Sequence, residues 1–294
     1  MRFAYFFAQP GNLFLFGHAV LDQLQQFQAR KALGQNFLFD ENIVRKIVAA
    51  IAPSRQDFII EVGPGFGALT KFLLESNCRY LGVEVDSRLV PELEAKFGEK
   101  ENFTLKNEDF LKLDLGEIAN RNDRVRIIGN IPYHITSQII FNALEARGVV
   151  KDLVLMIQRE VADRIVAGSG NKTYGILSVV SQTFSTPEIL FKVSRNVFIP
   201  KPDIESAVVR WDFSRPSAKL PENDDFFRNV VRTVFNHRRK TLANTLKKFV
   251  DPAQFGQTTG LDLRRRPEEL TVEEHVELSN KLIRFRKEHQ SRSR

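Results

Sequence analysis

The chain has 294 residues, of which 43% are hydrophobic and 27% are charged. This balance is typical of a globular protein and excludes disordered, collagen-like and disulfide-rich chains. The single cysteine, Cys78, excludes an internal disulfide bond and a cysteine-based zinc site, and we expect no bound metal. The formal net charge is +7, and residues 201–294 hold 20 Lys and Arg against 14 Asp and Glu. This basic last third predicts a polyanionic partner, with nucleic acid as the first candidate.

The N-terminal stretch, residues 3–21, contains no Asp, Glu, Lys or Arg. It is interrupted by Pro10 and Gly11, so no apolar run reaches the roughly 18 residues that a membrane helix needs. It lacks an A-x-A-like cleavage site, and it has too little Arg and Ser for a mitochondrial presequence. We interpret residues 1–25 as a poorly ordered extension or the product of an upstream start codon. We expect a cytoplasmic protein without membrane association.

From Asp40 onward, helical and strand patterns alternate. Asp40 precedes a helical pattern that runs to residue 51, and further helices are predicted at residues 69–74, 89–97 and 137–146. Short apolar runs predict strands at residues 58–62, 80–85, 103–105, 125–128 and 153–157. Strands that alternate with helices indicate a doubly wound α/β sheet that is covered by helices on both faces.

Residues 185–213 break this alternation. Two β-type runs, 189–193 and 207–211, are separated by prolines, which favours an antiparallel pair at the sheet edge. Residues 214–223 have the composition of a linker, and residues 224–294 show helical periodicity with almost no strand pattern. We therefore predict an α/β domain over residues 26–215 and a helical, basic domain over residues 216–294.

A glycine-rich loop, residues 61–67, follows a predicted strand and opens a predicted helix. Gly63 and Gly65 allow a sharp turn and a close approach of a ligand to the backbone. The spacing is G-x-G-x-G, and Pro64 removes an N–H group that a pyrophosphate would need, so NAD is disfavoured. S-adenosylmethionine (SAM) fits better. Glu84 ends the next strand, where it can accept both ribose hydroxyls, and Asp109 follows the third strand, where it can bind the adenine amino group.

The sequence Asn-Ile-Pro-Tyr at 130–133 follows the fourth predicted strand. This tetrapeptide suits the methylation of an exocyclic amine, which is a poor nucleophile because its lone pair is delocalised. The Asn130 side-chain oxygen and the Pro132 carbonyl can each accept an amino hydrogen, which directs the lone pair toward the methyl donor. Tyr133 can stack on a base that has left its helix or loop. The alternative interpretation is a β-turn followed by a core tyrosine.

Over about residues 28–285 the chain resembles the ribosomal RNA adenine N6-dimethyltransferases of the KsgA type. The resemblance depends on KALGQNFL (31–38), EVGPGFG (61–67), GNIPY (129–133), EVADRIV (160–166) with YGILS (174–178), VFIPKP (197–202) and FNHRRKTL (235–242). It implies a Rossmann-like class I SAM-dependent methyltransferase domain followed by a small all-α domain. It also implies SAM contacts at Asn36, Leu38, Gly63, Glu84, Asp109 and Asn130. Phe198 would stack on the target adenine opposite Tyr133, although most of the 25 phenylalanines must be core residues.

The product of this family is a pair of adjacent N6,N6-dimethyladenosines near the 3′ end of small-subunit (16S-type) ribosomal RNA. The resemblance thus implies an rRNA partner, in an immature small subunit, and we expect a monomeric enzyme. A basic cluster without an intervening acid would hold RNA phosphates; its members are Arg232, Arg238, Arg239, Lys240, Lys247 and Lys248. A solvated helix face is the alternative for this cluster.

Two other functions stay open at this point. One is an erythromycin-resistance type methyltransferase that modifies a large-subunit (23S) adenine, since that family shares the SAM segments and the Asn-Ile-Pro-Tyr motif. The other is a non-catalytic RNA-binding factor of ribosome assembly. The segments at 174–178 and 236–242 resemble the small-subunit enzymes more closely, and neither the motif nor the acids are degraded.

Overall fold

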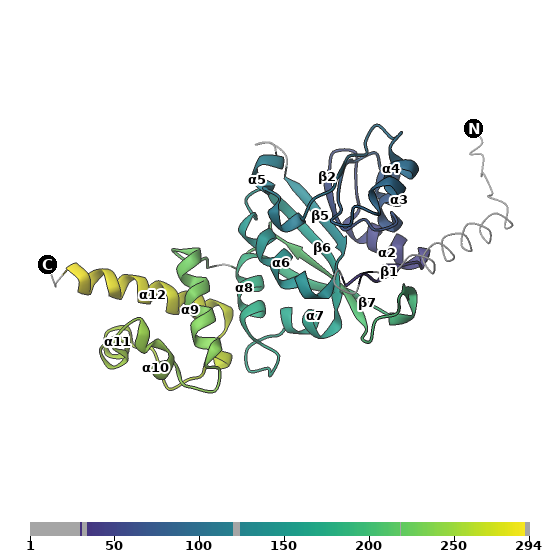
Figure 1. Ribbon diagram of the computed structural model, residues 1–294. Coiled ribbons are helices and arrows are strands. Elements are labelled where there is room, and N and C mark those ends of the chain that lie inside the picture. Colours follow the sequence, from purple (N-terminus) through teal and green to yellow (C-terminus); the bar gives the residue numbers. More distant parts are fainter. Residues whose placement is uncertain (1–29, 31–33, 120–123, 218, 292–294) are drawn as a thin grey trace, which may run out of the picture.

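The computed structural model describes residues 30, 34–119, 124–217 and 219–291, so the predicted extension at residues 1–25 lies outside the described residues. Its centre is a seven-stranded sheet with the strand order β4-β3-β2-β5-β6-β9-β7 (Figure 1). The parallel strands are β2 (Phe58–Val62), β3 (Arg79–Val83), β4 (Leu105–Lys106), β5 (Val125–Asn130) and β6 (Val150–Gln158). At one edge, β9 (Ser206–Asp212) is antiparallel to both β6 and β7 (Thr186–Val193). The doubly wound sheet and the antiparallel pair at its edge are as predicted.

Both faces of this sheet are covered by helices. Successive strand residues face opposite sides, so that Ile59 lies in one hydrophobic core and Ile60 in the other. One face packs against α2 (Glu41–Ile51), α3 (Ala68–Glu75) and α4 (Val90–Phe97). The other packs against α5 (Leu115–Ile118), α6 (Thr136–Glu145), α7 (Arg159–Ile165) and α8 (Ile176–Phe184). Because the sheet is buried on both sides, its strands are nearly continuous apolar runs.

Some local elements are as the sequence predicts, and others are not. The predicted helix cap is present, since Asp40 accepts the N–H of Asn42. Sequence periodicity missed α7 and α8, because α7 buries only Ala162 and Ile165 and α8 is rich in β-branched residues. The strand predicted at 103–105 is β4, which begins only at Leu105.

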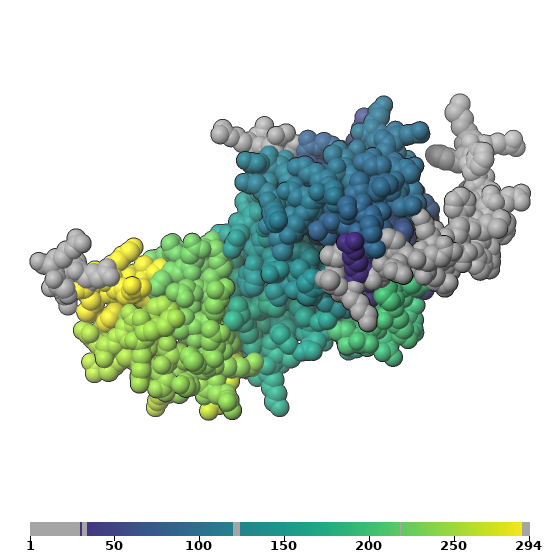
Figure 2. Space-filling model, in the orientation of Figure 1, coloured from purple at the N-terminus to yellow at the C-terminus, as the bar shows by residue number. Residues whose placement is uncertain are grey.

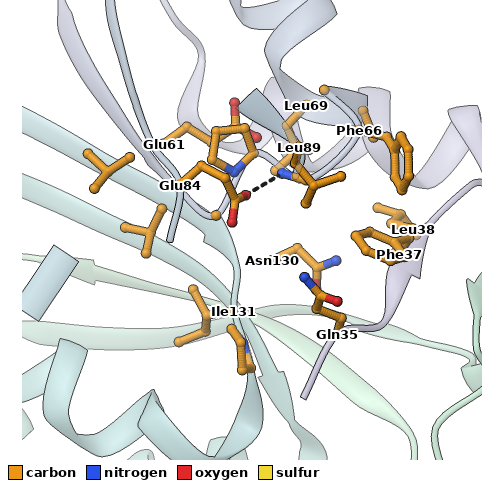
Figure 3. Close-up of a pocket in the computed structure, with 18 of the residues that line it drawn as sticks. Gln35, Phe37, Leu38, Glu61, Phe66, Leu69, Glu84, Leu89, Asn130 and Ile131 are labelled. Atoms are coloured by element: carbon orange, nitrogen blue, oxygen red, sulfur yellow. Dashed lines mark hydrogen bonds between the residues drawn. The ribbon is translucent and has the colours of Figure 1, made fainter. Parts of the chain in front are cut away.

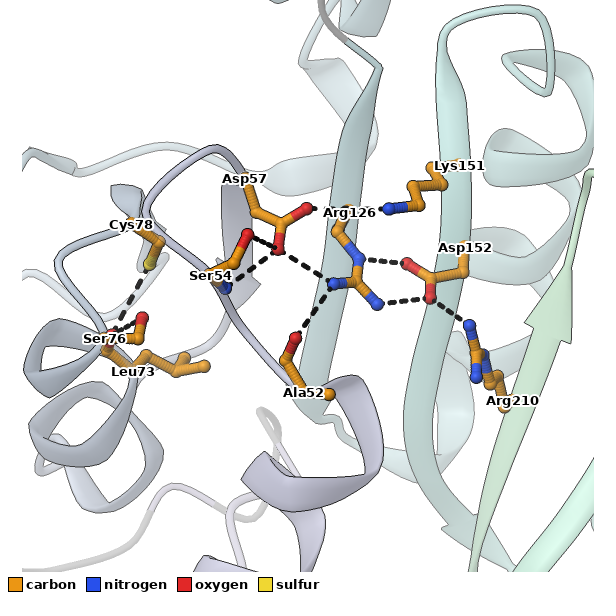
Figure 4. Close-up of polar contacts among 10 residues, drawn as sticks. All are labelled: Ala52, Ser54, Asp57, Leu73, Ser76, Cys78, Arg126, Lys151, Asp152 and Arg210. Atoms are coloured by element: carbon orange, nitrogen blue, oxygen red, sulfur yellow. Dashed lines mark hydrogen bonds and ion pairs between the residues drawn. The ribbon is translucent and has the colours of Figure 1, made fainter.

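Charged side chains join four segments near the amino-terminal ends of β5, β6 and β2 and the carboxy-terminal end of β9 (Figure 4). Arg126 of β5 donates to Asp152 of β6 from Nε at 2.8 Å and from Nη2 at 2.6 Å. It also pairs with Asp57, just before β2, at 3.1 Å, and Arg210 of β9 contacts Asp152 at 2.9 Å. Asp152 is fully buried and Arg126 is 5% exposed. Since these residues lie on β5, β6, β9 and the start of β2, their pairing fixes the lateral alignment of the sheet.

Four helices form the C-terminal part: α9 (Asp224–Asn236), α10 (Leu242–Thr245), α11 (Pro252–Thr259) and α12 (Val272–Ser291). Figure 2 shows these residues, in green to yellow, as a lobe beside the α/β unit. The lobe packs on α8, where the ring of Phe227 meets that of Phe184 edge-on at 5.9 Å. Residue 216 lies between β9 and α9. Among the described residues, no helix is both long and apolar enough to cross a membrane.

Candidate active site

A cavity of about 930 Å³ opens where β2, β3 and β5 end. Nine of the residues predicted from the sequence line it: Asn36, Leu38, Gly63, Gly65, Glu84, Asp109, Asn130, Pro132 and Tyr133. Figure 3 shows Glu84 and Asn130 approaching this space from the ends of β3 and β5, the strands on either side of β2, with Phe37 and Phe66 on another side. Residues nearly a hundred positions apart in the sequence therefore share one cavity, as expected for the carboxyl edge of a doubly wound sheet.

The glycine loop between β2 and α3 presents its backbone to the cavity. Gly63 has φ +65° and Gly65 has φ +63°, a conformation that L side chains rarely adopt. A Cβ added to Gly63 would meet no atom within 4 Å, so backbone conformation rather than crowding explains this glycine. The Gly65 N–H donates to the Glu84 carboxylate at 3.0 Å. The loop and the acid after the next strand are thus held together.

Glu84 is 4% exposed and lies just after β3. Its Oε2 accepts from Gly65, and its Oε1 accepts the N–H of Asp86 at 2.9 Å. Burial raises the pKa of Glu84, and these backbone donors oppose the effect. Each carboxylate oxygen has a second lone pair. Glu84 is therefore fixed in place and can still accept hydrogen bonds from a ligand.

Asp109 follows β4 and begins a short 3-10 helix, Phe110–Lys112. Its Oδ1 accepts the N–H of Leu111 at 3.0 Å, which orients the side chain beside the cavity. The same residue therefore serves as a helix cap and as a cavity-lining acceptor.

The Asn-Ile-Pro-Tyr segment connects β5 to α6. The Asn130 Nδ2 donates to the backbone carbonyl of Asn36 at 3.0 Å. Because that carbonyl can only accept, the amide nitrogen of Asn130 faces it and the side-chain oxygen remains available as an acceptor. The Pro132 carbonyl accepts a 3.3 Å bond from Ile135, and the Tyr133 hydroxyl lies 2.8 Å from Ser206 Oγ. The alternative of a plain turn with a core tyrosine does not fit, since Tyr133 lines the cavity.

Phe198 is the predicted site residue that the structure does not bring to the cavity. It is 3% exposed and belongs to the hydrophobic core, where it pairs with Leu38 across two short antiparallel strands, β1 (Phe37–Leu38) and β8 (Phe198–Ile199). In this structure Phe198 packs as a core aromatic residue and is not among the residues that line the cavity.

Glu61, to which sequence reasoning gave no role of its own, also lines the cavity. It is 1% exposed, and its Oε2 accepts from Thr70 Oγ1 and from the Tyr80 hydroxyl, both at 2.7 Å. Burial raises the pKa of Glu61 to about 7, although both hydroxyls lower it. The signal in the sequence is an acid within an otherwise apolar strand.

The predicted basic cluster divides into two kinds of side chain. Exposed on the C-terminal lobe are Arg232, Arg239, Lys240, Lys247 and Lys248. Arg238 is partly buried and donates to the carbonyls of Lys172 and Asn171, in the loop between α7 and α8. It therefore ties the C-terminal lobe to the α/β unit.

Residues 26–284 match the family described as ribosomal RNA adenine dimethylase. Curated relatives named ribosomal RNA small subunit methyltransferase A include one from Alkaliphilus oremlandii, 42% identical over 89% of this chain and 94% of the relative. Another, from Chlorobium phaeobacteroides, is 44% identical over 87% of this chain and 95% of the relative. The chain belongs to this family. The expected enzyme class, an rRNA adenine dimethyltransferase, is confirmed.

Solved structures agree on the fold. A dimethyladenosine transferase from Plasmodium falciparum superposes with a TM-score of 0.71 at 24% identity, covering 85% of this chain and 98% of that chain. A structure of the 23S rRNA methyltransferase ErmE gives a TM-score of 0.65 at 25% identity, covering 84% of this chain and 100% of that chain. The predicted class I methyltransferase fold is confirmed.

Proposed function

We propose that the protein transfers methyl groups from SAM to the N6 amines of two adjacent adenosines near the 3′ end of small-subunit ribosomal RNA. One observation carries the proposal: Glu84, an acceptor suited to a ribose, and Asn130, an acceptor suited to an amine, open into the same cavity. Bound SAM supplies the methyl group as an electrophile.

The residues of the cavity fit SAM. A volume of about 930 Å³ lies within the range of small-molecule pockets, roughly 300–1,000 Å³. The backbone of Gly63 and Gly65 approaches SAM without an intervening side chain. Glu84 accepts hydrogen bonds from the ribose hydroxyls of SAM, and the free oxygen of Asp109 accepts one from the adenine amine of SAM. Asn36 and Leu38 close the cavity from the N-terminal side.

Two acceptors prepare the target amine for attack. The Asn130 side-chain oxygen accepts a hydrogen bond from one amino hydrogen. The Pro132 carbonyl accepts a hydrogen bond from the other, because its long bond to the Ile135 N–H leaves one lone pair available. This pair of contacts draws the nitrogen out of conjugation and directs its lone pair toward the methyl group. The amine proton becomes acidic as the new bond forms, so no strong base is required.

The base is held by stacking on Tyr133, whose hydroxyl is anchored by Ser206. The adenine must first leave its RNA stack to enter the cavity. A stacking role for Phe198 requires the β1–β8 pair to open when the base binds, because Phe198 is buried here and pairs with Leu38.

RNA phosphates contact the exposed basic side chains of the C-terminal lobe, which position the RNA without selecting its sequence. The small-subunit relatives are 42% and 44% identical to this chain, whereas the ErmE structure is 25% identical, which favours the small-subunit substrate. We expect a monomer that acts in the cytoplasm on immature small subunits.

The test is transfer of labelled methyl from SAM to purified small subunits that lack the modification, with large subunits in parallel. Mass spectrometry of the digested RNA locates the product. Dimethyladenosine at two adjacent small-subunit adenines supports the proposal. Label only in the large subunit assigns the resistance-type reaction, and no transfer to either favours an assembly factor. Asn130→Ala should abolish transfer while SAM binding stays measurable, and full activity of this variant would refute the role of Asn130.

A further inference from the structure

A short segment, residues 34–39, lines the cavity and contacts both the glycine loop and the Asn-Ile-Pro-Tyr segment. We call it the strap. Its β1 strand pairs with β8, and the Phe39 N–H donates to the Val197 carbonyl at 3.1 Å. Phe37 meets Phe66 of the glycine loop edge-on at 4.9 Å. The strap is therefore positioned where the cofactor loop and the methyl-acceptor site meet.

Gln35 anchors the strap on the cofactor side. Its Nε2 donates to Asp86 Oδ2 at 2.9 Å, and its Oε1 accepts the N–H of Arg30 at 2.9 Å. The Asp86 side chain is fully buried and is also held by Arg88 at 2.6 Å, so this anchor is rigid. Asp86 in turn donates its backbone N–H to Glu84. One chain of contacts thus runs from the cofactor acid to the strap.

The strap reaches the acceptor side through two neighbours of Gln35. The Asn36 carbonyl accepts a hydrogen bond from the Asn130 side-chain amide at 3.0 Å. Gly34, with φ +59°, lies against the motif so closely that an added Cβ would stand 3.1 Å from His134 Nδ1 and 3.2 Å from Pro132 Cβ. The position of the strap backbone therefore decides where the Asn130 oxygen points.

We propose that Gln35 is a positioning residue for methyl transfer: by holding the strap against Asp86, it aligns the Asn36 carbonyl and thereby fixes the Asn130 oxygen on the target amine. The inference rests on the proposed function. It assigns to Gln35 an effect on the transfer step itself, separate from cofactor affinity.

Gln35→Met keeps the length of the side chain and removes the amide, and Gln56→Met at an exposed turn is the matched control. Three quantities are measured: the single-turnover rate at saturating SAM, the Kd for SAM, and the thermal midpoint. Losing a hydrogen bond to a charged acceptor should slow transfer about tenfold in Gln35→Met. The Kd should change by less than about threefold, the rate of Gln35→Met should be reduced even at temperatures well below its midpoint, and the control variant should match wild type.

A second variant keeps the proposal testable if Gln35→Met folds poorly. Gly34→Ala places a methyl group between the strap and the motif, and it should slow transfer more than Gln35→Met does. Unchanged rates in both variants would overturn the proposal. So would a loss confined to the SAM Kd, or a rate that falls only in step with the thermal midpoint. Wild-type protein that transfers no methyl at all would instead overturn the proposed function.

Discussion

Replacing Glu61 by Gln tests whether this buried carboxyl opposes folding at neutral and alkaline pH. Burial raises the pKa of Glu61 from its ordinary 4.5 to about 7, against the hydrogen bonds from Tyr80 and Thr70. Because the folded pKa lies above the unfolded one, the native state retains a proton that the unfolded state releases. The contribution of Glu61 to stability is therefore present below about pH 4.5 and is lost as the pH rises to about 7.

The magnitude follows from the two pKa values. At about 1.4 kcal/mol per pKa unit, the raised pKa costs the native state about 3 kcal/mol at pH 8, where the buried carboxyl has mostly ionised. Glutamine keeps an oxygen that can accept from Thr70 and Tyr80, and it never ionises. Glu61→Gln should therefore be about 3 kcal/mol more stable than wild type at pH 8 and similar to it at about pH 4.5.

Urea unfolding of both proteins at several pH values between about 4.5 and 8 measures this difference. Taking the difference removes the contribution of titrating groups that do not interact with Glu61. Glu99→Gln provides the matched control, because it makes the same substitution at an exposed position. Parallel stability curves for wild type and Glu61→Gln, or a variant that is less stable at pH 8, would refute the reasoning.

Three further predictions concern packing, charge pairing and RNA contact. Gly67→Ala, at φ +84°, would bring a Cβ to 2.4 Å from a ring carbon of Phe97 in α4. Urea unfolding should show that the free energy of unfolding falls by about 3 kcal/mol, and an unchanged midpoint would contradict this. Arg126→Met leaves the buried Asp152 with one partner, so thermal unfolding should show a loss of about 4 kcal/mol; a loss below about 1 would refute it. Replacing Arg239 and Lys240 by Gln should weaken RNA binding and flatten the slope of log affinity against log salt by about 1.5, and an unchanged slope would remove both from the interface.

The fold could be predicted largely because its strands are buried on both faces. Continuous apolar runs such as Phe58–Val62 are visible in the sequence without knowledge of their neighbours. The antiparallel edge was predictable for a different reason, since prolines interrupt the alternation there. The helix α8 was not predictable, because its β-branched run is compatible with a strand or a helix, and only its packing against α9 and α12 decides. The helix α7 was not predictable because it buries only Ala162 and Ile165.

The candidate site was predictable where strand ends carry the residues. Strand order places Glu84 and Asn130 at one edge, so that their nearness follows from the fold. The positions of Gln35 and Phe198 depend instead on the pairing of two short strands, β1 and β8, which are far apart in the sequence. No periodicity in the sequence encodes such a pairing, and it is this pairing that buries Phe198. Sequence reasoning therefore could assign Phe198 a role but could not tell which way its ring faces.

The two acids of the cavity show why burial decides chemistry that residue type leaves open. Glu61 and Glu84 both lie at strand ends beside the glycine loop. Glu84 is stabilised by the N–H groups of Gly65 and Asp86, which favour its charged form and leave lone pairs for hydroxyl donors. Glu61 is more deeply buried, has only hydroxyl partners and is repelled by the charge of Glu84, so its pKa rises to about 7. One acid therefore suits ligand recognition, and the other is only partly ionised at neutral pH.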